Sequence, residues 1–191
     1  MLRAIIAEAC AIAAFFWAGE NLQLLLGLAA AVMMIPAITG SCGLYEIAGW
    51  NSCEIVKRND RKLKPAVVAT ALLLAVAGSF ASAVLTRNIF LDDLQSVNDA
   101  YNLALQSTGQ AETNGAAVQQ EDLERAFIAF QGKYSKYRPL TVKYDGNFTA
   151  QMNNISAAID GSKQEIILGN LSSAHEELKR IGPIIELMQD R

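Results

Sequence analysis

The apolar residues of this chain follow two patterns, and the change comes near Arg87. Before that residue they form long runs with almost no charge outside one basic cluster. After it they recur every three or four residues among charged and polar side chains, as in amphipathic helices. The pattern predicts an all-α protein with two domains in two solvents: a transmembrane domain over residues 1–87 and an extramembrane domain over residues 88–191.

Three apolar runs are predicted to span the membrane, over residues 4–18, 22–39 and 66–86. The third has no charged residue over 21 positions, which lets one helix cross a hydrocarbon core of about 30 Å. We expect the first two to pack as a membrane helical hairpin about the turn Gly19-Glu20-Asn21. Their small residues, Gly27 among them, let helix backbones approach closely in lipid.

The first run is short and carries Glu8. It could be a short span, a span whose carboxylate reaches an interface, or a signal peptide. A signal peptide is disfavoured, since Arg3 and the amino terminus are its only positive charges and Glu8 interrupts the apolar run. Glu8 is a functional candidate as an ionisable group near the hydrocarbon, although an ion pair with Arg3 is the favoured interpretation.

The loop over residues 55–64 sets the predicted orientation. Positive charge stays on the cytoplasmic side of a membrane, so the N-terminus is expected in the cytoplasm and the C-terminal domain in the periplasm. Binding of the same cluster to anionic lipid would predict the same orientation. The topology determinants are Lys57, Arg58, Arg61, Lys62 and Lys64.

Residues 40–54 hold two of the three cysteines, Cys42 and Cys53. In one straight helix these thiols would lie about 16 Å apart. Three glycines favour a bent segment at the membrane interface instead, with Tyr45 and Trp50 as headgroup-level anchors. In a bent segment the thiols could converge.

The motifs Thr-Gly-Ser-Cys-Gly-Leu-Tyr (residues 39–45) and Gly-Trp-Asn-Ser-Cys (residues 49–53) carry a family resemblance. With the apolar helix pair before them, they resemble the YgaP-like transmembrane domain over about residues 1–56. Gly43 stands where that family usually has proline. The resemblance implies a bacterial inner-membrane protein of unknown function. It also suggests sulfur handling at Cys42 and Cys53, since the module is often attached to a rhodanese domain, which this chain lacks. Packing of small side chains is the favoured alternative.

Helical periodicity predicts four helices in the C-terminal domain, arranged as an antiparallel four-helix bundle. The first, separate from the third span or continuous with it, ends before a polar linker at residues 107–116. The second covers residues 119–137 with an aromatic seam, and the third begins near Asp145. The fourth begins at a cap on Asn170 and is kinked at Gly182-Pro183. The seam residues of the second helix are Leu123, Phe127, Phe130, Tyr134 and Tyr137.

The run from Phe148 to Arg191 resembles the last two helices of the periplasmic four-helix cytochromes. Haem does not carry over from that resemblance. The Cys-x-x-Cys-His motif is absent, and the single histidine, His175, lies near the start of the last helix. Two cysteines also fall short of a four-ligand zinc site. We therefore expect no cofactor, no metal, and a surface or seam-edge position for His175.

Charge and the positions of the candidate residues disfavour two classes of function, nucleic-acid binding and catalysis. A net charge of −3 without a basic stripe gives no case for a nucleic-acid partner, and His175 is predicted to lie across the membrane from both thiols, which disfavours an enzyme. We expect a non-catalytic accessory or assembly/binding module in the inner membrane. Its partners would be the lipid bilayer and either a second copy or a larger membrane complex. The alternative is a sulfur- or thiol-handling or transport-associated protein that uses Cys42 and Cys53.

Overall fold

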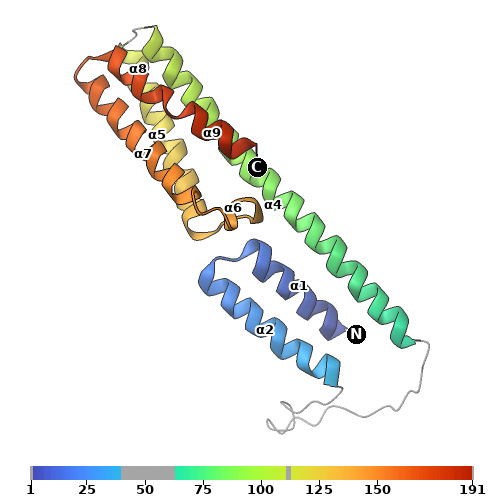
Figure 1. Ribbon diagram of the computed structural model, residues 1–191. Coiled ribbons are helices and arrows are strands. Elements are labelled where there is room, and N and C mark those ends of the chain that lie inside the picture. The colour runs from blue at the N-terminus through green and yellow to red at the C-terminus, as the bar shows by residue number, and fades with distance from the viewer. Residues whose placement is uncertain (1, 40–62, 111–112, 191) are drawn as a thin grey trace. The chain divides into compact units, whose positions relative to one another are not determined.

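The computed structural model describes residues 2–39, 63–110 and 113–190. Every regular element in these ranges is a helix (Figure 1). The elements are α1 (Leu2–Trp17), α2 (Glu20–Thr39), α4 (Leu63–Gly109), α5 (Thr113–Lys136), α6 (Leu140–Lys143), α7 (Phe148–Ile167), α8 (Leu171–Lys179) and α9 (Gly182–Gln189).

The chain divides into two compact units, Met1–Leu85 and Thr86–Arg191. The division falls inside α4, which runs for 47 residues without interruption. No proline follows Pro65 in α4 and no capping signal separates its two parts, so the backbone hydrogen-bond ladder has no reason to end there. The third apolar run and the first helix of the C-terminal unit are therefore one element.

In the N-terminal unit, α1 and α2 lie side by side, joined at Ala18-Gly19 (Figure 1). The backbone N–H of Gln23 donates to the Gly19 carbonyl at 2.7 Å, which closes the start of α2. The residues buried between helices are mostly small, as expected where backbones approach closely. They are Ala7, Ala14, Phe16, Ala18 and Ala30.

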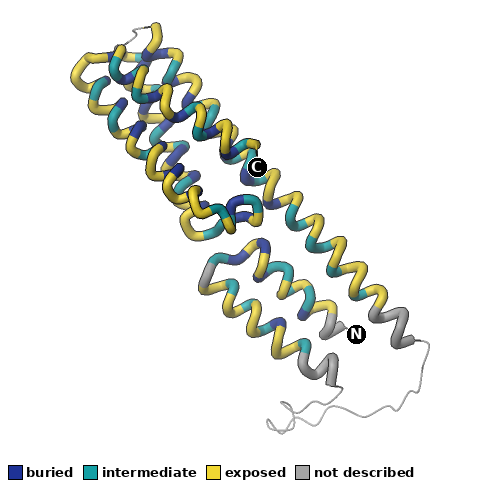
Figure 2. Tube along the Cα trace, viewed as in Figure 1, coloured by how far each residue is buried: buried dark blue, intermediate teal, exposed yellow. Residues whose placement is uncertain are grey.

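Many residues along the helices of this unit are exposed (Figure 2), and large apolar side chains are among them. Leu24, Leu73, Val76 and Phe80 are each at least 70% exposed. Within the described residues, one helix is long and apolar enough to cross a membrane, the Ala69–Gly109 stretch of α4, and α1 and α2 contribute two shorter apolar helices. Such a surface suits hydrocarbon rather than water.

The C-terminal unit has its own core, which joins the second part of α4 to α5, α7, α8 and α9. Phe90 of α4 is its aromatic centre: its ring lies 5.0 Å from that of Tyr134 and 5.6 Å from that of Phe130 (centroid distances). Phe127, Phe130 and Tyr134 are at most 3% exposed, which confirms that this seam is core. Tyr137 packs against the same cluster while remaining partly exposed.

The predicted linker at residues 107–116 is mostly helical instead. Ser107 and Thr108 each donate a side-chain hydrogen bond to the Ala104 carbonyl, at 3.0 and 2.9 Å, and α4 continues to Gly109. Helix α5 then begins at Thr113 because Ala116, fully buried, packs in a second small cluster. The prediction failed because polar residues were taken as a loop signal, although their hydroxyls bond back to the helix.

The last predicted helix is divided into α8 and α9. Asn170 caps α8 by accepting a hydrogen bond from the Ser173 N–H, as predicted. Gly169, with φ of +76°, adopts the left-handed conformation that ends the preceding helix. The helix is then interrupted between Lys179 and Gly182, ahead of Pro183 at the start of α9. The break lies where the sequence predicts a kink.

Candidate functional site

Most residues singled out from the sequence lie outside the described residues. The thiol pair Cys42 and Cys53 and the anchors Tyr45 and Trp50 are in this group, as are Lys57, Arg58, Arg61 and Lys62. For Lys64 the structure describes the backbone, in the first turn of α4, but not the side chain. The remaining cysteine, Cys10, is a half-buried free thiol in α1.

His175 makes a structural link between α8 and the end of α4. Its Nδ1 lies 3.1 Å from the Leu105 carbonyl oxygen and 3.1 Å from Thr108 Oγ1. A carbonyl oxygen only accepts, so Nδ1 carries a hydrogen and donates it. The half-buried ring sits at the edge of the core, which favours the seam-edge position over the surface position that the sequence also left open.

A partly buried polar contact joins α4 to α5. The Tyr134 hydroxyl and the Lys133 ammonium both donate to Oδ2 of Asp93. Burial, and then the hydrogen bond to the Asp93 carboxylate, raise the pKa of Tyr134 well above its ordinary value of 10.0. The phenol is therefore held in its neutral form.

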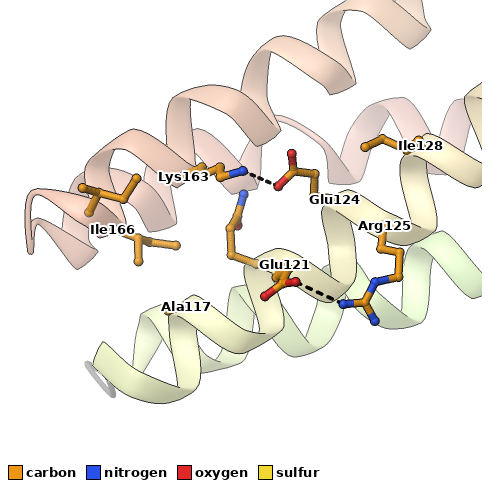
Figure 3. A pocket seen from close by; sticks show the side chains of 9 residues that line it. Ala117, Glu121, Glu124, Arg125, Ile128, Lys163 and Ile166 are labelled. Carbon is orange, nitrogen blue, oxygen red and sulfur yellow. Dashed lines mark hydrogen bonds and ion pairs between the residues drawn. The ribbon is translucent and has the colours of Figure 1, made fainter.

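The C-terminal unit has a cleft of about 470 Å³ between α5 and α7 (Figure 3). We call it the α5–α7 cleft. It is lined by Ala117, Gln120, Glu121, Glu124, Arg125, Ile128, Lys163, Ile166 and Ile167.

Paired charges occupy the centre of the α5–α7 cleft. Lys163 Nζ of α7 lies 2.6 Å from Glu124 Oε2 of α5, and Arg125 Nη2 lies 3.2 Å from Glu121 Oε1 within α5 (Figure 3). The hydrogen bond to Glu124 raises the pKa of Lys163. These are surface pairs that salt screens, so each adds little stability. Their main effect is to place positive and negative groups next to each other along the α5–α7 cleft.

The floor of the cleft is polar and buried. Gln120, 2% exposed, donates from Nε2 to the Ile159 carbonyl and to Ser162 Oγ, both at 2.8 Å. Ser162 in turn donates to the Ile159 carbonyl at 2.9 Å. Among the described residues Gln120 Oε1 has no partner. The Nε2 bonds fix the spacing of α5 and α7, and therefore the width of the cleft.

Apolar side chains flank the charges. Ile128 is 58% exposed and Ile167 is 76% exposed, and Leu168 next to Ile167 is 77% exposed. Exposed aliphatic side chains beside paired charges are a common composition for protein–protein contact surfaces. Sequence reasoning missed this site, because its residues lie off the apolar seams. The one available signal was the adjacent pair Ile167-Leu168 just before Gly169.

The groups that line the α5–α7 cleft are charged, polar and aliphatic. Within the described residues, no group of three or more histidine, cysteine, aspartate or glutamate side chains is placed to hold a metal ion. The α5–α7 cleft offers charges and apolar contacts instead, without a nucleophile next to a base.

Comparison with known families gives one result. Residues 1–55 match the family described as "Inner membrane protein YgaP-like, transmembrane domain". Neither the curated proteins nor the solved structures provide a match. The resemblance predicted from the cysteine motifs is thereby confirmed, and the chain is a membrane protein associated with the lipid bilayer through an inner-membrane domain.

Proposed function

Starting from this YgaP-like transmembrane domain, we propose that the protein is a non-catalytic accessory or assembly module of the inner membrane. In this proposal α1, α2 and the first part of α4 span the bilayer, with the N-terminus in the cytoplasm. The second part of α4, α5, α7 and the α8–α9 pair form an antiparallel four-helix bundle in the periplasm. The basic cluster at residues 55–64 supports this orientation.

The observation that carries the proposal is the composition of the α5–α7 cleft. Ile128 and Ile167 are exposed on either side of two acid–base pairs. The complementary partner is another polypeptide, with a helix that places apolar side chains against the two isoleucines and a mixed-charge face against Glu121 and Lys163. Surface pairs of this kind give specificity and orientation more than affinity.

Site-specific photo-crosslinking in intact cells tests the proposed surface. A crosslinking residue at position 128 or 167 should capture the same single protein, and Lys163→Glu should abolish both products by reversing one charge of the cleft. The purified partner should then bind the purified full chain, with the same dependence on Lys163.

Leu187 of α9, 51% exposed and outside the cleft, provides the matched control. A crosslinking residue there should give no product, and Leu187→Glu should leave the other two unchanged. A product with twice the mass of this chain would identify a second copy and contradict the proposal of a different partner. Crosslinked products that persist with Lys163→Glu would contradict the proposal that the partner binds at the α5–α7 cleft.

The proposed topology is tested separately with C-terminal reporter fusions. Alkaline phosphatase, which is active only after export, should be active on the full chain, and a cytoplasm-dependent fluorescent protein should be dark. The reverse result would place the C-terminal unit in the cytoplasm. Replacing the five basic residues of the loop by glutamine should then weaken the orientation preference.

The matched segment includes Cys42 and Cys53, which favours a second candidate function in sulfur or thiol handling. Intact mass spectrometry of protein purified without oxygen or reductant tests it. An added sulfur that disappears on replacing both cysteines by serine would support this role. If both cysteines carry unmodified thiols, the result would count against sulfur handling and favour the assembly function.

A further inference from the structure

The N-terminal unit contains a second hollow, which has a different chemistry. It is a groove of about 760 Å³ formed by α1, α2 and the first part of α4, a size typical of small-molecule sites. Its lining is almost entirely apolar and includes Phe15 and Phe16 of α1, Met34 of α2 and Leu72 of α4. We call it the α1–α2–α4 groove.

Among the described residues that line this groove, Glu8 is the one ionisable side chain and Ser79 the one other polar side chain. Glu8 makes no ion pair with any described side chain, unlike the glutamates of the α5–α7 cleft. The side chain of Arg3, the partner expected from the sequence, lies outside the described residues. A carboxylate beside apolar surface in a membrane helix is costly without a counter-charge. As far as the described side chains form it, the groove therefore has one unmet electrostatic preference, for a single positive charge.

The aromatic and sulfur side chains add to that preference. Phe15 and Phe16 pack edge to face, with ring centroids 4.9 Å apart. Aromatic rings attract cations through their negative faces, and the thioether of Met34 is soft and adaptable. A hard metal ion would need several oxygen ligands, whereas the groove offers one carboxylate and one hydroxyl. An anion would be repelled by Glu8.

We propose that the α1–α2–α4 groove binds a lipophilic organic cation of single positive charge, with Glu8 as its counter-ion and Phe15, Phe16 and Met34 as its apolar contacts. This site lies in the N-terminal unit and is independent of the partner surface on the C-terminal unit. Failure of either proposal leaves the other standing.

Binding of tetraphenylphosphonium to the full chain in lipid nanodiscs tests the site, with empty nanodiscs as the baseline. Wild-type protein should bind the radiolabelled cation saturably in equilibrium dialysis. Glu8→Gln, which keeps the side-chain shape and removes the charge, should weaken binding roughly tenfold or more. Glu8→Asp should retain binding. Tetraphenylborate, with nearly the same shape and the opposite charge, should show no saturable binding.

Equal affinity of wild type and Glu8→Gln, or no saturable binding by wild type, would overturn the proposal. A second measurement uses the wild-type chain alone, in case the variants fail to insert. A lipophilic carbodiimide should modify Glu8, as read by mass spectrometry, and tetraphenylphosphonium should protect it while tetraphenylborate does not. Modification that the cation leaves unchanged would also overturn the proposal.

Discussion

At the scale of a single residue, Tyr134 makes the stability of the C-terminal core depend on pH. Its hydroxyl donates to Asp93 while its ring packs on Phe90, so ionisation would lose the hydrogen bond and place two negative charges together. The folded state therefore holds the phenolic proton to a higher pH than the unfolded state does. This contribution to stability is fully present below pH 10 and is lost as the pH rises above the ordinary pKa of 10.0.

We predict that Tyr134→Phe lessens this loss. At neutral pH the substitution should cost about 1 kcal/mol for the missing hydrogen bond. Above pH 10 the variant should lose about 1.4 kcal/mol less per pH unit than wild type, the value for one titrating group. The measurement is the unfolding free energy of the C-terminal unit in the full chain, followed by near-ultraviolet circular dichroism in mild detergent. Parallel curves for the two proteins at high pH would refute the assignment to Tyr134.

At the scale of one element, the interruption between α8 and α9 places Gly182 in close contact with Tyr101 of α4. A Cβ placed on Gly182 would lie 2.9 Å from the Tyr101 hydroxyl oxygen, and Tyr101 is 7% exposed. The side chain therefore has little room to withdraw. Glycine at this position lets α9 begin against α4.

Gly182→Ala is accordingly predicted to destabilise the C-terminal unit by about 1–3 kcal/mol, through overpacking against Tyr101. Gly132, close to the C-terminal end of α5, is the matched control, because a Cβ there meets no atom within 4 Å. Gly132→Ala should stabilise by about 0.5–1 kcal/mol through helix propensity. Denaturant unfolding of both variants decides the matter, and a shift of the same sign in both would show that contact with Tyr101 is unimportant.

The elements differ in how well the sequence predicts them. Helix α7 and the seam of α5 follow from apolar spacing, because burial in a core imposes a period on the sequence. The end of α4, the start of α5 and the short α6 do not. They depend on the back-bonding hydroxyls of Ser107 and Thr108, on the burial of Ala116 and on the burial of Val142, respectively. The α5–α7 cleft is harder still: it is built from exposed residues of separate helices, and no periodicity marks them.

At the scale of the whole molecule, each unit has its own packing. The core of Thr86–Arg191 is drawn only from residues of that unit, and its length exceeds the limit of about 40 residues below which domains need external support. Many of its large apolar side chains are buried, among them Leu94, Leu123 and Ile155. We expect this unit to fold by itself.

Expression of residues 86–191 alone should give a soluble, helical protein that unfolds in one cooperative transition. Circular dichroism and sedimentation provide the measurement. Ile155→Ala, at a position 1% exposed in that core, should cost about 2–5 kcal/mol by leaving a cavity. A fragment that is helical but unfolds gradually, with no response to Ile155→Ala, would mean that the core forms only in the full chain.

The division into two units also separates the natural chromophores. Both tryptophans, Trp17 and Trp50, lie before residue 86, whereas Tyr101, Tyr134, Tyr137 and Tyr144 lie after it. Selective excitation of indole therefore reports on the membrane unit alone. Phenol absorbance reports mainly on the C-terminal unit, so one unlabelled sample yields separate optical records of the two units.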